Sequence, residues 1–173
     1  MKIVQKDDPV LRQKAQEIPL EKIGSPEIKK IIKQMSEALV KEDDGVALAA
    51  PQIGKSLRLF IISGKLFQKE NDKKKPADLV FINPKIKKLS QRKQKLEEGC
   101  LSVRWLYGLV SRADKATVEA YNETGQKFSR SGSGLMAQIF QHEMDHLDGT
   151  LFVDKAKNLQ RIEPEKMRHG NRI

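Results

Sequence analysis

The chain has 173 residues, which suits one domain with a sizeable hydrophobic core, and no apolar run in it is long enough for a membrane-spanning helix. Charged residues make up 32% of it and aromatic residues only 5%, so recognition of single-stranded nucleic acid by base stacking is not favoured. The net charge of +10 fits either a solvated lysine surface, as we expect at Lys73 to Lys75, or an acidic partner such as ribosomal RNA.

The N-terminal segment contains acidic as well as basic residues and lacks the apolar core of a signal peptide. We therefore expect the protein to remain in the compartment where it is made, a cytoplasm. Its single cysteine, Cys100, cannot form an internal disulfide. In a reducing compartment such a residue is a buried small side chain, a reactive thiol or a metal ligand.

The first half of the chain contains patterns typical of a helix, of strands and of a loop. They predict an amphipathic helix at 26–41, β-like apolar runs at 56–63 and 79–84, and an exposed, lysine-rich loop at 64–78. Pro26 directly after Ser25 suits the start of the helix. Pro84 is expected to end the second apolar run.

The second half predicts a hairpin over 116–129 and then a helix that begins near Ser131 to Ser133 and ends at Asp148-Gly149. Strands in the middle of the chain and a helix near each end indicate an α+β fold, with antiparallel sheets around a central helix. We expect a single domain over 1–173, in which 154–173 form a charged tail that is only partly ordered.

The stretch "IFQHEMDHLDG" (139–149) places two histidines and a glutamate on one side of the last helix. Because an α-helix turns by about 100° per residue, His142 and His146 continue an apolar stripe that begins with Leu135 and Ile139. Glu143 lies in the neighbouring apolar stripe. The pattern therefore sets a carboxylate in an apolar environment beside two imidazoles.

This arrangement is typical of a metal site that performs hydrolysis. Histidines four residues apart can bind one metal ion, and Glu143 can act as a general base on the water that the metal activates. The alternative is two core histidines and a stray acid, but by composition the pattern arises by chance in under about one per cent of chains of this length. Catalytic sites of this kind usually have three protein ligands. Cys100 is the candidate for the third, whereas His169 lies in the charged tail, where we expect it to be solvated.

Three stretches together resemble the signature motifs of the peptide deformylases, in the family's order. They are "GVALAAPQIG" (45–54), "EEGCLS" (97–102) and "QHEMDHLDG" (141–149), and the resemblance extends over the chain to about Val153. It implies a hydrolase that removes the formyl group from the N-terminal formyl-methionine of nascent polypeptides and releases formate. It also implies transient contact with the ribosome, and neither DNA nor a membrane as a partner.

The resemblance assigns roles to individual residues. It makes Cys100, His142 and His146 the ligands of one divalent metal ion, Glu143 the acid and base, and Gln52 and the Leu101 backbone N–H the groups that hold the formyl oxygen. Members of the family natively favour Fe²⁺ and also work with Zn²⁺ or Ni²⁺. The ligand set suits each of these metals.

The substrate methionine requires an apolar pocket. We expect Val46, Leu135 and Ile139 to help line it, although Leu135 equally suits a plain core position, and the resemblance implies that the Gly45 backbone pairs with the substrate main chain. A charged residue at position 139 should then raise KM for formyl-methionyl peptides.

The sequence departs from the family pattern at two places. Ala47 replaces a glycine and would be strained if its φ were positive, and Arg104-Trp105 stand where proline followed by glycine or glutamate is common. Neither departure affects a predicted ligand. In addition, Asp145 points away from the metal stripe, and we expect it to form an ion pair with Arg112.

Two other functions stay open at this point. A metallopeptidase shares the His-Glu-x-x-His helix, but it would usually take its third ligand from further downstream, where this chain has mostly charged tail. An RNA- or ribosome-associated deformylase-like protein with weak or no activity would explain the net charge and Ala47.

Overall fold

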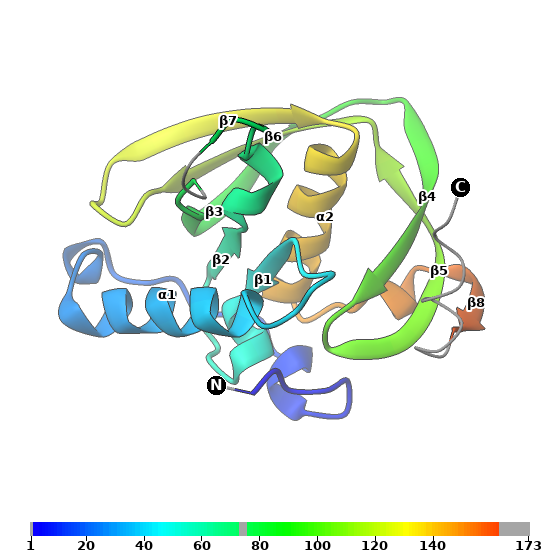
Figure 1. Ribbon diagram of the computed structural model, residues 1–173, viewed down its shortest axis with the longest axis horizontal. Helices are drawn as coiled ribbons and strands as arrows, with labels where there is room; N and C mark the ends of the chain where they lie inside the picture. The colour runs from blue at the N-terminus through cyan, green and yellow to red at the C-terminus, as the bar shows by residue number, and fades with distance from the viewer. Residues whose placement is uncertain (1, 73–75, 163–173) are drawn as a thin grey trace.

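The computed structural model describes residues 2–72 and 76–162, so the predictions for Lys73 to Lys75 and for His169 lie outside the described residues. Within this part, helices and strands follow in an α+β order (Figure 1). The helices are α1 (Pro26–Leu39) and α2 (Leu135–Leu147), and the strands are β1 (Ala47–Ala49), β2 (Leu59–Ile62), β3 (Leu79–Leu89), β4 (Lys93–Cys100), β5 (Val103–Ala113), β6 (Lys115–Tyr121), β7 (Lys127–Ser133) and β8 (Lys157–Arg161).

The strands form two antiparallel sheets. One has the order β1-β2-β3-β6-β7 and the other the order β4-β5-β8. Helix α2 lies between them and contacts strands of both, including β5, β6 and β7 (Figure 1). This agrees with the predicted arrangement of antiparallel sheets around a central helix, and it brings the helix that carries both histidines next to the end of β4.

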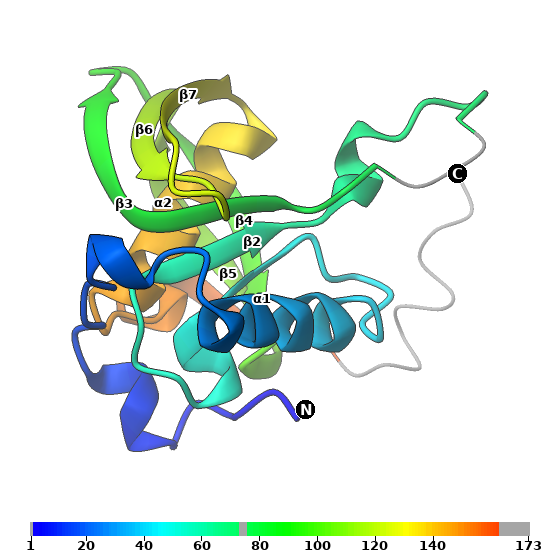
Figure 2. The same cartoon turned by 90° about the vertical axis from the view of Figure 1, so that its left-hand side faces the viewer.

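The two helices cover opposite faces of the larger sheet (Figure 2). Successive residues of a strand point to opposite faces. In β2, Ile61 therefore joins the core under α1, whereas Phe60 joins the core under α2. Phe60 stacks on Phe81 of β3, with ring centroids 4.5 Å apart. The resulting two-sided burial fixes the register of the central strands.

Helix α1 confirms the helix predicted from the apolar periodicity. Ser25 is its N-cap, with the Oγ accepting a hydrogen bond from the Ile28 N–H at 3.3 Å, and Pro26 is its first residue. The start predicted for α2 near Ser131 to Ser133 is wrong, because β7 continues through Ser133. Gly134, with φ of 54°, makes the turn from the strand into the helix.

The prediction that Pro84 ends its strand is also wrong. Strand β3 continues to Leu89, and its register with β6 shifts between Ile82 and Lys85. Asn83 has φ of 49° at this bulge, and its side-chain amide bonds both the N–H and the C=O of Ile18. A proline lacks the N–H that a regular ladder needs, and a bulge is a place in a strand that tolerates it.

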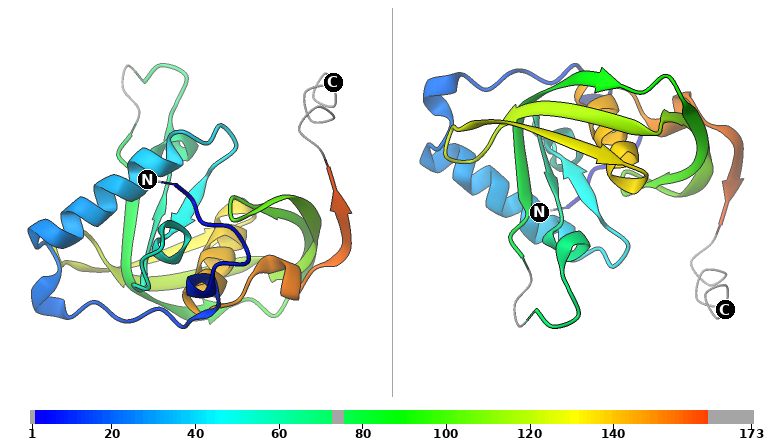
Figure 3. Two further views of the ribbon diagram at one scale, coloured as in Figure 1. Left: turned by 90° about the horizontal axis from the view of Figure 1, so that it is seen from below. Right: turned by 90° about the horizontal axis from the view of Figure 1, so that it is seen from above.

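Two further segments are more ordered than expected. Within the loop predicted at 64–78, Gly64–Phe67 form a 3₁₀ turn, and Gly64 is buried against the backbone of Pro76. Within the predicted tail, Lys157–Arg161 form strand β8, which pairs with β5 at the outer edge of the smaller sheet (Figure 3). Their side chains are all exposed and mostly polar, so they have no alternating apolar pattern that predicts a strand. None of the helices in the described residues has the length and apolar character needed to cross a membrane.

Candidate metal centre

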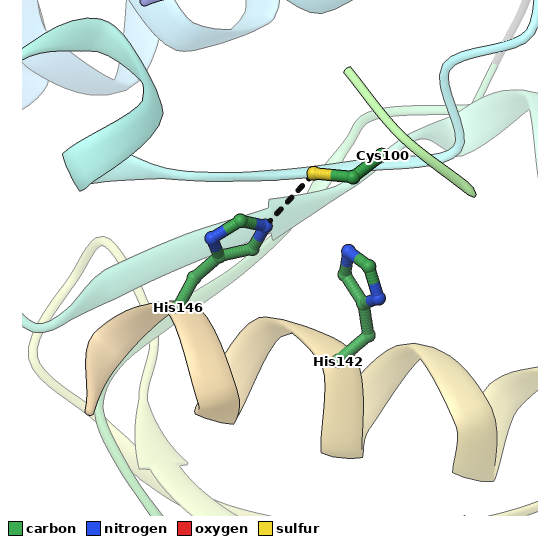
Figure 4. A group of neighbouring side chains, drawn as sticks. All are labelled: Cys100, His142 and His146. Atoms are coloured by element: carbon green, nitrogen blue, oxygen red, sulfur yellow. Dashed lines mark hydrogen bonds between the residues drawn. The ribbon is translucent and has the colours of Figure 1, made fainter. Parts of the chain in front are cut away.

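Cys100, His142 and His146 come together at one place in the structure. Cys100 is the last residue of β4, and the two histidines lie one turn apart on α2 (Figure 4). Their possible ligand atoms all lie within 4.8 Å of one another, and the Cys100 Sγ is 3.2 Å from the His146 Nε2. A thiol and two imidazoles this close form a donor set suited to a borderline-soft divalent metal ion.

Glu98 orients one of these histidines. It lies two residues before Cys100, so both side chains are on the same face of β4. The Glu98 Oε2 is 3.0 Å from the His142 Nδ1, which leaves the Nε2 of that ring as its ligating nitrogen. A carboxylate behind a histidine is the usual device that fixes the ring orientation at a metal centre.

A buried arginine holds Glu98 in turn. The Arg112 Nε and Nη2 donate to the two Glu98 oxygens at 2.7 and 2.8 Å, and the Arg112 Nη1 donates to Asp145 at 2.7 Å. The predicted Asp145–Arg112 ion pair is therefore confirmed. Burial alone would raise the pKa of Glu98, but its hydrogen bonds with Arg112 and His142 lower this pKa to about 2. Glu98 is thus a carboxylate at neutral pH.

The environment of Cys100 favours the thiolate. Burial opposes ionisation, but the charges and hydrogen bonds of His146 and His142 outweigh it and lower the pKa of Cys100 to about 5. The Ser102 N–H and the Gln52 Nε2 also donate to the sulfur, at 3.4 and 3.5 Å. A thiolate, and not a thiol, is the form of cysteine that binds metals.

Glu143 is a buried carboxylate beside this donor set. It is 3% exposed, and burial raises its pKa to about 7. Its Oε2 is buried without a hydrogen-bond partner among the described residues. An unpaired buried oxygen of this kind is costly, and a metal ion with its water would supply the missing partner. The residues present therefore fit a metal ion.

Gln52 reaches the same place from the other side. Its Oε1 accepts a hydrogen bond from the Ala49 N–H at 2.8 Å, which fixes the orientation of the amide. Its Nε2 donates to Ser102 at 3.2 Å as well as to Cys100. The amide N–H groups are thus held beside the thiol of Cys100, and the next residue, Leu101, is buried.

A cavity of about 300 Å³ opens onto these groups. Its lining contains nine of the ten residues predicted for the site, and His146 lies behind Cys100. The nine are Gly45, Val46, Gln52, Cys100, Leu101, Leu135, Ile139, His142 and Glu143.

The predicted pocket residues differ in burial. Ile139 is 4% exposed, whereas Val46 is 36% and Leu135 54% exposed, so these two lie at the rim of the cavity. The prediction that the stripe of α2 faces inward is therefore wrong for its first residue. Leu135 is the first residue of the helix and lies at the open side of the cavity.

Of the two departures from the family pattern, only one carries strain. Ala47 lies in β1 with a negative φ, so its side chain narrows the cavity without straining the backbone. Trp105 has φ of 67°, a conformation that a bulky residue rarely adopts. Arg104 and Trp105 both line the cavity.

Sequence reasoning missed Glu98, although its spacing from Cys100 is a signal. A glutamate two residues from a candidate ligand lies on the same side of a strand, and a strand was not predicted there. The role of Arg104, which bonds Glu42 and Asp44 across the cavity, has no comparable local signal because its partners lie about 60 residues away in the chain.

Comparison with known proteins decides the family. The model of the polypeptide deformylase family matches residues 1–162. The chain belongs to the polypeptide deformylase family. It is 41% identical to "Peptide deformylase" of Desulforudis audaxviator, over 91% of this chain and 94% of that protein. It is also 41% identical to "Peptide deformylase 1A, chloroplastic" of Solanum lycopersicum, but it spans 58% of the length of that relative.

Solved structures of deformylases have the same fold. A peptide deformylase from Synechococcus elongatus, solved in complex with actinonin, has a TM-score of 0.80 and 35% identity, over 91% of this chain and 81% of that one. The Thermotoga maritima deformylase has a TM-score of 0.77 and 33% identity, over 90% and 97%. Deformylases are metal-dependent hydrolases that act on N-formyl-methionyl peptides, so the chain is an enzyme of this class.

We expect Arg112→Ala to destabilise the protein by about 3–5 kcal/mol, because it leaves the buried carboxylate of Glu98 without its arginine, whereas Asp145 keeps its ion pair with Lys155. Arg92→Ala removes an arginine whose side chain is 79% exposed, and it should cost under about 1 kcal/mol. Urea denaturation of both variants measures the difference. Equal losses of stability would contradict the importance of the buried pair.

We expect wild-type protein to bind one divalent metal ion per chain, and Cys100→Ser and His142→Ala to lose most of it. Removal of the metal by a chelator should lower the Tm, because the ion binds the folded state. Metal analysis after dialysis checks this, with His169→Ala as the control that retains its metal. Unchanged metal content in both site variants would show that these residues are not ligands.

Proposed function

We propose that this chain removes the formyl group from N-terminal formyl-methionine, with Cys100, His142 and His146 holding the metal and Glu143 transferring the proton. The observation that carries this proposal is the buried oxygen of Glu143, which has no hydrogen-bond partner within residues 2–72 and 76–162 and lies beside those three donors. When bound, the metal ion supplies Lewis-acid chemistry that lowers the pKa of a water molecule and polarises the formyl carbonyl.

Glu143 moves one proton in the reaction. It accepts a proton from the attacking water, whose oxygen forms a bond to the formyl carbon. It then delivers this proton to the amine nitrogen as the carbon–nitrogen bond breaks. Formate and a free N-terminal amine result. A carboxylate whose pKa lies at about 7 is suited to both steps near neutral pH.

Gln52 and Leu101 stabilise the charge that develops on the formyl oxygen. The bond between the Gln52 Oε1 and Ala49 holds the Nε2 beside Cys100, and the Nε2 donates to the formyl oxygen in exchange for its long bond of 3.5 Å to the sulfur. The Leu101 N–H is the second donor, because it belongs to the tight turn directly after Cys100. Donors fixed before the reaction provide much of the rate enhancement at such sites.

The substrate occupies the cavity with its methionine side chain against Ile139, and Val46 and Leu135 flank the entrance. The Gly45 N–H already donates to the Glu42 carbonyl at 3.1 Å, so pairing with the substrate main chain uses the Gly45 carbonyl oxygen. This arrangement places the formyl group at the closed end of the cavity and the remainder of the peptide toward its mouth.

The native metal in this proposal is Fe²⁺, and Zn²⁺ or Ni²⁺ are replacements that the same donor set accepts. A cytoplasmic location suits Cys100, because a reducing compartment preserves a thiol ligand. Transient contact with the ribosome suits an enzyme whose substrates are nascent chains, and the net charge of +10 favours it.

We expect Glu143→Gln to lower kcat/KM for formyl-methionyl peptides by about a hundredfold or more while metal content stays at one ion per chain. Glu97→Gln is the matched control, because Glu97 also lines the cavity but is exposed, and its activity should match wild type. Formate release by anaerobically purified protein is the readout. Equal rates in Glu143→Gln and wild type would contradict the mechanism, and cleavage of internal peptide bonds would favour a metallopeptidase.

We expect Ile139→Ala to raise KM for formyl-methionyl peptides by about tenfold, because it removes apolar surface from the methionine pocket. Ile31→Ala removes a similarly buried isoleucine from the core under α1 and should leave KM unchanged. Steady-state kinetics on both variants separates the pocket from general loss of packing. An unchanged KM in Ile139→Ala would remove this residue from the pocket.

A further inference from the structure

Arg104 connects the two walls of the outer cavity. One wall is the loop between α1 and β1, and the other is the start of β5. The Arg104 Nη1 donates to both carboxylate oxygens of Asp44, at 3.2 and 2.9 Å, and its Nη2 donates to Glu42. The Arg104 side chain is 23% exposed and that of Glu42 is 30% exposed, so the bond between them is partly shielded from water, whereas Asp44 is 54% exposed. An arginine that bonds two carboxylates at once is held more firmly than an ordinary surface pair.

A bulge at the start of β5 directs Arg104 toward this loop. The register pairs Gly99 with Tyr107 and Cys100 with Val103, so residues 104–106 have no partner in β4. Neighbouring strand residues normally point to opposite faces. Here the Arg104 guanidinium lies 5.6 Å from the centre of the Trp105 ring, and both side chains line the cavity. Bulges beside active sites commonly redirect side chains in this way.

The strained backbone of Trp105 belongs to the same arrangement. Its φ of 67° is unfavourable for a bulky residue, and the surrounding bonds keep it in place. One of these bonds is the hydrogen bond at 2.9 Å from the Ile162 N–H to the Trp105 carbonyl. Strained residues of this kind concentrate at functional sites, where the surrounding structure fixes them.

The loop that Arg104 bonds carries part of the substrate site. Residues 40–46 contain no helix or strand, and this segment includes Gly45 and Val46. At its end, the Val46 carbonyl accepts a hydrogen bond from the Ser63 N–H at 2.8 Å. The ion pairs of Arg104 add a connection from the loop to β5, and both Asp44 and Arg104 line the cavity. The position of Gly45 therefore depends on both walls.

We propose that Arg104 is a positioning residue that clamps this loop, so that the nascent chain beyond its methionine binds between Gly45 and the wall formed by Trp105. The proposal rests on the deformylase function and adds to it the part of the cavity that receives the residues after methionine. The clamp acts through Gly45 and not on the reacting atoms. It therefore affects the binding of substrates long enough to reach the outer cavity, and it leaves the chemical step unchanged.

Kinetics with two substrates of different length test this role. For Arg104→Ala we expect KM for formyl-Met-Ala-Ser to rise about tenfold, which corresponds to the loss of a partly buried ion pair. KM for formyl-methionine amide, and kcat on both substrates, should stay within about twofold of wild type. Arg104→Lys should recover part of the loss, and the Glu42→Gln/Asp44→Asn double variant should reproduce it. Arg92→Ala, at an exposed ion pair outside the cavity lining, is the control and should change neither KM.

Two further measurements sharpen the test. In wild type, 1 M salt should raise KM for the longer substrate, because the screening length falls to about 3 Å, and this increase should be absent from Arg104→Ala. In Trp105→Gly, the glycine adopts the positive φ without strain, but the indole ring is lost. KM for formyl-Met-Ala-Ser should therefore rise, whereas KM for formyl-methionine amide should not. An unchanged KM in Trp105→Gly would remove the ring from the proposed wall.

The outcomes separate the clamp from the proposed function. If Arg104→Ala raises KM equally for both substrates, or for neither, the clamp is wrong although the enzyme is a deformylase. If wild-type protein with its metal hydrolyses neither substrate, the proposed function fails and the clamp fails with it.

Discussion

Arg112 bonds carboxylates from two different elements inside the protein, Glu98 of β4 and Asp145 of α2. Its side chain is 4% exposed, and that of Glu98 is 2% exposed. Burying any one of these charges without its partner would cost free energy, so the folded positions of β4, β5 and α2 depend on one another. Because Glu98 also orients His142, and Cys100 lies two residues further on the same strand, this ion pair fixes the distance between the two elements that carry the metal ligands.

The other charged groups at the metal centre help to offset the free-energy cost of burying Arg112 and Glu98. A thiolate and the carboxylate of Glu98 lie beside two imidazoles, and Glu143 lies in an apolar environment that raises its pKa. Arg112 balances one of the negative charges, and a divalent cation would balance the others. In the absence of a metal, the charges of His146 and His142 stabilise the thiolate, and a bound divalent cation would take over this role.

The sequence was most informative where one local pattern determined the outcome. The spacing of His142, Glu143 and His146 on a helix, and the capping by Ser25, depend on residues a few positions apart, and the structure agrees with both. The predicted end of β3 was wrong because a bulge at Asn83 accommodates Pro84. The proline alone gives no sign of this bulge in the sequence. Strand β8 was missed because its side chains are exposed, so its pairing with β5 depends on backbone bonds that leave no hydrophobic pattern.

The site illustrates the same limit. The predicted residues came together because three motifs that resemble one family are each local, whereas the role of Glu98 depends on His142 and Arg112, its partners on other elements. The two departures from the family pattern also looked equivalent in the sequence. In the structure, Ala47 occupies an ordinary strand conformation, whereas Trp105 is strained at a bulge. The strained backbone of Trp105 disfavours the folded state. A function at the cavity that needs this conformation best explains why the strain is present. This places the distinctive chemistry of the chain at the mouth of the cavity, and the shared chemistry of the family at its closed end.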